Sequence, residues 1–210
     1  MTGRRAIILS PEARVRIAEA VRLAETQTSG EIVVMVSARA GAYRSVALLV
    51  ALLGGLILPW ILIWLTDLSA AAIALGQAGL VLLLLAAGLS EPLRLMLVPE
   101  GMRRARAREA ARLAFGSRGL SRTRGRTGVL IYLAMAERHA EIVADAGILT
   151  RIGPERWNAA LCGLIGALRR GEIEAGLVGA VEQVGAILSA EFPPGPDDPN
   201  ELPDRVIVAE

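Results

Sequence analysis

Residues Val46 to Leu65 read VALLVALLGGLILPWILIWL, and residues Ala70 to Leu89 read AAAIALGQAGLVLLLLAAGL. Neither run contains a charged side chain, and an α-helix of about 20 apolar residues crosses the roughly 30 Å of hydrocarbon in a bilayer. Only Thr66 to Ser69 separate the two runs, so the chain must reverse direction there. The pattern predicts two transmembrane helices, at 46–65 and 70–89, that form a hairpin.

The alternative is a pair of helices buried in a soluble protein. It would require a chain of 210 residues to shield about 40 consecutive apolar residues on all sides. A signal peptide is disfavoured as well, because the first run begins after a segment that already carries folding signals. A hydrophobic content of 53% and a mean hydropathy of +0.48 agree with a membrane protein.

The distribution of arginine predicts the orientation of this hairpin. All 23 basic residues are arginine, yet the net charge is only +2, which argues against a nucleic-acid-binding polycation. No arginine lies between Ser45 and Leu93, whereas Arg39 and Arg44 precede the first run and Arg94 follows the second. Positively charged flanks remain in the cytoplasm, so we expect both termini to be cytoplasmic.

The sequence before the hairpin predicts one helix and one strand. Ser10-Pro11-Glu12 is a typical helix start, with a capping hydroxyl, a proline at the first position and an acidic residue near the positive end of the helix dipole. Residues 31–36 (EIVVMV) form a continuous β-branched run typical of a buried strand. One helix and one strand cannot make a core, so we expect a discontinuous domain formed by residues 1–41 and 102–192.

The sequence after the hairpin supplies the missing partners. Residues 101–116 read as a helix rich in alanine and arginine, and 117–127 as a basic loop. Two strands, at 128–133 and 140–145, predict an antiparallel pair, and two amphipathic helices follow from Gly153 and from Ile173. Residues 193–210 are Pro-rich and acidic, and we expect an extended tail.

Three short motifs and their order resemble the TPM domain family. They are Gly30–Val34 (GEIVV), Thr127–Leu133 (TGVLIYL) and Glu137-Arg138. The chain is similar in particular to the bacterial branch that carries an inserted transmembrane hairpin. The resemblance implies an α/β fold, with a mixed β-sheet flanked by helices on both faces and interrupted by the two-helix hairpin. It also implies a location in the bacterial inner membrane.

The resemblance leaves several functions open. Some members of the family are described as phosphatases, some bind divalent cations through acidic residues at strand ends, and others act as assembly factors. Where many members have a glycine-tyrosine-glycine turn after the third strand, this chain has Asp145-Ala146-Gly147. Only Gly147 can be carried over, which puts any activity tied to that turn in doubt.

Carboxylates are the most informative candidate site residues. Glu31 opens the first strand and Asp145 closes the third, and hard cations such as Ca²⁺ or Mg²⁺ need several oxygen ligands from separate segments. We therefore expect Glu31 and Asp145 to lie close together at one edge of the sheet as metal ligands. The alternative is that Glu31 acts as a cap or pairs with Arg138 and that the acidic residues of the tail are solvated. These tail residues are Asp197, Asp198, Glu201 and Asp204.

Other reactive side chains give weaker signals, and no nucleotide-binding or zinc-binding motif is present. His139 is the sole histidine, and we interpret it as a solvated turn residue rather than a general base. Cys162 is the sole cysteine, which excludes an intrachain disulfide, and we interpret it as a small core thiol. The arginines between Arg103 and Arg112 fit the wet face of a helix and would also attract anionic lipid headgroups.

Two functions therefore remain. The first is a membrane-anchored interaction module that assembles or maintains membrane proteins, with the lipid bilayer and a membrane protein as its partners and no catalytic residues. The alternative is a divalent-metal-assisted phosphatase that uses Glu31 and Asp145, which rests on the family resemblance. A pore or transporter subunit is disfavoured because Gln77 is the only strongly polar side chain in the two runs.

Overall fold

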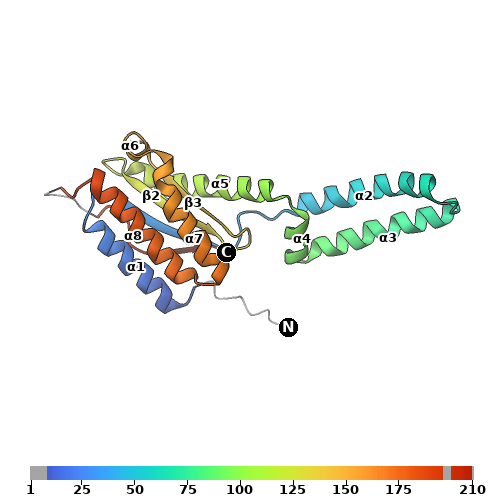
Figure 1. Cartoon of the computed structure of the whole chain (residues 1–210), viewed down its shortest axis with the longest axis horizontal. Coiled ribbons are helices and arrows are strands. Elements are labelled where there is room, and N and C mark those ends of the chain that lie inside the picture. The colour runs from blue at the N-terminus through green and yellow to red at the C-terminus, as the bar shows by residue number, and fades with distance from the viewer. Residues whose placement is uncertain (1–8, 196–199, 210) are drawn as a thin grey trace. The chain divides into compact units, whose positions relative to one another are not determined.

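A computed structural model describes residues 9–195 and 200–209 (Figure 1). The chain divides into two compact units. One unit combines the segment up to Ala40 with the segment from Arg104 onward, and it contains the α/β domain. The other unit, Gly41–Arg103, contains the apolar helices.

The α/β unit contains the following elements in chain order, with α5 beginning shortly before it. They are α1 (Pro11–Glu25), β1 (Glu31–Ser37), α5 (Glu100–Ser117), the 3-10 turn η1 (Leu120–Arg122), β2 (Gly128–Ala134), β3 (His139–Ala144), α6 (Ala146–Leu149), the 3-10 turn η2 (Pro154–Trp157), α7 (Asn158–Arg170), α8 (Ile173–Glu191) and β4 (Ile207–Ala209). The predicted start of α1 is confirmed, because the Ser10 hydroxyl accepts a hydrogen bond from the amide of Ala13 at 3.1 Å.

The four strands form one mixed sheet in the order β3-β2-β1-β4. β1 runs parallel to β2 and to β4, while β3 runs antiparallel to β2. The register pairs Glu31 with Gly128 and Ser37 with Ala134, so β1 and β2 are matched along their whole length. The predicted mixed sheet is therefore confirmed.

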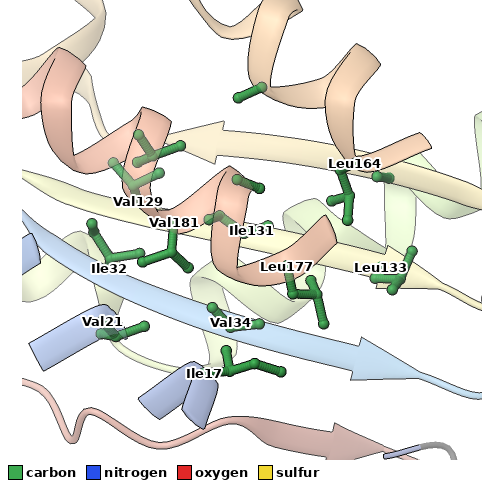
Figure 2. Close-up of a cluster of buried hydrophobic side chains, with 14 of the residues drawn as sticks. Ile17, Val21, Ile32, Val34, Val129, Ile131, Leu133, Leu164, Leu177 and Val181 are labelled. Carbon is green, nitrogen blue, oxygen red and sulfur yellow. The ribbon is translucent and has the colours of Figure 1, made fainter. Parts of the chain in front are cut away.

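Helices cover both faces of this sheet, as predicted. Ile32, Val34 and the alternate residues of β2 point toward α1, α7 and α8 and form the larger core (Figure 2). Val33 and Met35 point to the opposite face, which α5 covers with Ala107 and its other buried alanines. Because both faces are covered, β1 and β2 are buried at every position, which explains their continuous apolar sequence.

Three differences from the sequence predictions lie outside the candidate site. The segment between the second apolar run and residue 100, where no element was predicted, contains a short helix, α4 (Glu91–Leu97), and the tail ends in a strand, β4, that pairs with β1. Cys162 is exposed, so its interpretation as a core thiol is wrong. The buried stripe of α7 runs through Ala160, Leu164 and Ala167, and a residue two positions after Ala160 points to the other side of the helix.

The second unit consists of α2 (Arg44–Leu65), α3 (Ala70–Leu89) and α4. Ala47, Ala51 and Gly55 are the buried residues of α2, and their spacing of four places them on one stripe that faces α3. A Cβ added at Gly55 would lie 2.6 Å from Val81 Cγ2, and one at Gly88 would lie 2.7 Å from Ala47 Cβ. Small residues at this interface let the two backbones approach closely, as in many membrane helix pairs.

Three helices within the described residues have the length and composition to span a membrane. Two of them, α2 and α3, direct most of their apolar side chains outward, and α3 has no buried residue. The third, α8, packs seven of its residues into the core of the α/β unit, mainly against α1 and α7. The apolar character of α8 is therefore explained by the fold of the domain.

Candidate functional site

Glu31 and Asp145 lie at the same end of the sheet. Gly128, the first residue of β2, pairs with Glu31 on one side, and its carbonyl accepts a hydrogen bond from the amide of Asp145 at 2.9 Å on the other. The two acidic residues are thus separated by the width of β2, about 10 Å between backbones at 4.8 Å per strand. Glu31 and Asp145 thus lie at the same edge of the sheet, but strand β2 separates their backbones.

The carboxylate of Glu31 holds the C-terminal tail. This side chain is buried, and its two oxygens accept hydrogen bonds from the amides of Glu201, at 2.9 Å, and Leu202, at 3.2 Å. Burial raises the pKa of Glu31, and the nearby charges of Glu201 and Asp204 add to this effect, although the two amide donors oppose it. The tail is therefore anchored at this point.

The alternative pairing of Glu31 with Arg138 is wrong. Arg138 lies in the turn between β2 and β3, after the carboxyl end of β2. Because β1 and β2 are parallel, that turn lies at the opposite end of the sheet from Glu31. Glu137, beside Arg138, accepts a hydrogen bond from the amide of Ala40 at 2.9 Å and so fixes the chain that leaves β1.

Asp145 caps the short helix α6. Its Oδ1 accepts a hydrogen bond from the amide of Ala146 at 2.6 Å, which satisfies one of the free donors at a helix start. Its Oδ2 is buried and has no hydrogen-bond partner within the described residues. One oxygen of Asp145 therefore has a structural role, while the other is available to a ligand.

A small pocket of about 210 Å³ lies beside Glu31 and is lined in part by Glu25, Asn200 and Asp204. Glu25 Oε1 accepts a hydrogen bond from the amide of Ile32 at 2.7 Å, and Oε2 is buried without a partner among the residues that the structure describes. Burial, followed by the charges of Glu31 and Asp204, raises the pKa of Glu25 to about 8. At neutral pH, Glu25 is mainly protonated.

The expected metal ligands fit a cation only in part. Asp145 offers a buried oxygen, but both oxygens of Glu31 already accept amide hydrogen bonds from the tail. Among the described residues, no three acidic, histidine or cysteine side chains are grouped to hold a metal ion. Asp197 and Asp198 lie outside the described residues. The cation site stays a prediction. To bind the ion, the Glu31 carboxylate would have to give up its hydrogen bonds from the amides of Glu201 and Leu202.

His139 is the first residue of β3 and is only partly exposed, which differs from the expected solvated turn residue. Its Nε2 lies 3.1 Å from Glu141 Oε2, and Arg108 Nε donates to Glu141 Oε1 at 3.2 Å. Burial raises the pKa of Glu141, but the hydrogen bond of His139 and the charge of Arg108 outweigh it and lower that pKa below its ordinary value. These contacts join α5 to β3.

Glu25 was not found from the sequence. It is the last residue of α1 and lies six positions before Glu31, in no known motif. Gly147, the glycine carried over from the family, has a structural role. A Cβ at this position would lie 2.6 Å from the carbonyl oxygen of Arg126 and 2.7 Å from that of Gly125. A glycine lets α6 pack directly on this backbone.

Comparisons with known proteins agree with this fold. The family model of the TPM domain matches residues 93–187. The solved NMR structure of the BA42 protein from the psychrophilic bacterium Bizionia argentinensis is similar, with 20% identity and a TM-score of 0.63, over 99% of this chain and 100% of that chain. At this identity the likeness shows a common fold. No curated protein matches the sequence. Over residues 93–187 this chain is therefore similar to the TPM domain family, and it shares the fold of the BA42 protein.

Proposed function

We propose that this chain is a membrane-anchored TPM domain that serves as an interaction module in the assembly or maintenance of membrane proteins. In this proposal α2 and α3 span the bacterial inner membrane, and the α/β unit and both termini are in the cytoplasm. The absence of charge from residues 46–65 and 70–89 and the arginines at their outer flanks support this setting.

The observation that carries the proposal is the pairing of β1 with β2. These neighbouring parallel strands are matched over seven residues, although the whole apolar hairpin lies between them in the sequence. Both ends of the hairpin therefore lead back into one folded domain, which must be on a single side of the membrane. A domain tethered twice remains next to the bilayer, where it can meet membrane proteins at high effective concentration.

Photo-crosslinking in native membranes tests this role. A photoreactive residue would replace Leu113 on α5 or Val15 on α1, because both are exposed apolar side chains on different faces of the domain. We expect one of the two positions to give a discrete product with a membrane protein, identified by mass spectrometry, and the other to serve as the matched control. Equal, diffuse products from both positions would contradict a specific interaction surface.

A second candidate, a metal-assisted phosphatase, is favoured by the unpartnered buried Oδ2 of Asp145. The purified full chain in detergent would be assayed for hydrolysis of a phosphomonoester with added Mg²⁺ or Ca²⁺. Metal-dependent turnover that is lost in Asp145→Asn would support this function, since asparagine retains the oxygen that caps α6. Turnover that is unchanged in the variant would exclude the role of Asp145, and no turnover with either cation would leave the interaction module as the function.

A further inference from the structure

Helix α4 exposes apolar side chains and buries its arginine, whereas a surface helix of a water-soluble protein buries apolar side chains and exposes charged ones. Met96 is 81% exposed and Leu93 is 48% exposed, whereas Arg94 is only 8% exposed. α4 packs against both α2 and α3. The helix thus directs Leu93 and Met96 outward and its arginine toward the base of the hairpin, which suits a position at the boundary between lipid and water.

Arg94 lines a pocket of about 570 Å³ at the base of the hairpin. Arg44 is the other charged residue of its lining, and the rest is apolar, including Leu48, Leu85 and Leu89. The Nε of Arg94 is buried without a hydrogen-bond partner among the described residues, and within them neither arginine forms an ion pair. A buried guanidinium is costly unless an anion or another acceptor satisfies it.

We propose that this pocket binds an anionic phospholipid, with the phosphate between Arg44 and Arg94 and an acyl chain along the apolar lining. Guanidinium groups bind phosphate through paired, charge-assisted hydrogen bonds. Arg44 begins α2 and Arg94 follows α3, so both lie at the same end of the hairpin. This inference rests on the proposed membrane setting, in which that end is at the cytoplasmic interface, where anionic lipids gather.

The apolar lining distinguishes a lipid from free phosphate. Leu48 and Leu82 are exposed in the protein alone, and both line the pocket together with Ala86. Inorganic phosphate would leave this surface uncovered, whereas an acyl chain would cover it. One phospholipid therefore accounts for both the unpartnered Nε of Arg94 and the apolar groove beside it.

Thermal unfolding of the full chain in a mild detergent tests the inference. Phosphatidylglycerol, phosphatidylcholine with the same acyl chains, and inorganic phosphate would be added in separate titrations. We expect phosphatidylglycerol to raise the Tm above the effect of phosphatidylcholine, because a ligand that binds only the native state stabilises it. Inorganic phosphate should produce no such rise. The double variant R44Q/R94Q should lose the difference between the two lipids.

Two further variants sharpen the result. R112Q/R118Q removes the same number of charges from exposed positions outside the pocket and should keep the lipid preference of the wild type. Ala86→Trp fills the groove but leaves both arginines, and it should also abolish the preference. An unchanged preference in R44Q/R94Q, or an equal response to inorganic phosphate, would overturn the proposal. If the chain stayed in solution without detergent, the membrane setting itself would be wrong.

Discussion

Glu25 Oε1 accepts a hydrogen bond from the amide of Ile32, with 2.7 Å between the oxygen and the nitrogen. The contact joins the last residue of α1 to the second residue of β1, and it places the Glu25 carboxyl close to Glu31. The pKa of Glu25 rises from 4.5 to about 8 because the group is largely buried and its neighbours are acidic. This contact makes the stability of the domain sensitive to pH.

We predict that Glu25→Gln makes the unfolding free energy less dependent on pH. Between pH 4.5 and about 8 the native protein holds a proton on Glu25 that the unfolded chain has released, so raising the pH destabilises the native state. Glutamine retains the acceptor for Ile32 but does not titrate. Denaturant unfolding of the full chain should show that the unfolding free energy of the variant falls less with rising pH than that of the wild type.

The exposed Glu182 on α8 supplies the matched control, and Glu182→Gln should follow the pH profile of the wild type. Glu31, whose pKa is also raised, contributes a change of the same sign, so the Glu25 variant should reduce the pH dependence rather than remove it. Identical slopes for Glu25→Gln and the wild type would contradict the assignment of the buried proton to Glu25.

Gly147→Ala should destabilise the domain by about 1–3 kcal/mol, because the added methyl group would overlap the backbone. The carbonyl oxygens of Arg126 and Gly125 would lie 2.6 and 2.7 Å from the new Cβ, and backbone atoms cannot rotate away as a side chain does. Gly116→Ala is the control, since a Cβ in that part of α5 meets nothing within 4 Å. Thermal melts should show a lower Tm only for Gly147→Ala.

Gly88→Ala should loosen the hairpin. Its new Cβ would lie 2.7 Å from the Cβ of Ala47, which is fixed to the backbone of α2. Gly79→Ala makes the same change in α3 where nothing lies within 4 Å. Hydrogen exchange in detergent should be faster across residues 44–89 in Gly88→Ala than in Gly79→Ala. Equal exchange in the two variants would mean that the helices do not pack through Gly88.

We predict that the C-terminus is cytoplasmic and that the turn at Thr66–Ser69 is outside. The prediction follows from two spans of about 20 residues with arginines at their outer flanks and none in the turn. A reporter active only in the cytoplasm should be active when fused after Glu210, and one active only outside should be active when inserted at Asp67. External activity of the C-terminal fusion would reverse the orientation.

The cation site can be tested without an assay of activity. If Asp145 Oδ2 and Glu31 bind Ca²⁺ or Mg²⁺, either ion should raise the Tm of the full chain at millimolar concentration. Asp145→Asn and Glu31→Gln should each remove that rise. The asparagine can still cap α6, so its own Tm without metal should change little. A wild-type Tm that does not respond to either ion would refute the site.

Local patterns predicted most of the elements, because each of them depends on residues close in sequence. The Ser10-Pro11 helix start, the continuous apolar run of β1 and the reversal at Thr66–Ser69 are examples. The tail contacts could not be predicted in this way. The bond from Glu201 N to Glu31 joins residues 170 positions apart, and β4 is a strand of three residues with no distinctive pattern.

The inward position of Arg94 was also beyond sequence reasoning. Its neighbours in EPLRLML predicted no element, and the direction of a side chain in so short a helix depends on what it packs against. The same applies to Glu25, whose burial comes from the tail and from β1 rather than from its own helix. Such residues become recognisable only when distant segments are brought together.

The pairing of β1 with β2 has a consequence for the synthesis of the protein. Roughly ninety residues, including both apolar helices, are translated after Ser37 before Gly128 is made. At about 5–20 residues per second, β1 waits on the order of 5 to 20 seconds for its central partner. During that time the apolar β1 segment has neither of the strands with which it pairs in the folded protein. Until β2 emerges, the unpaired edges of β1 are therefore open to pairing with other chains.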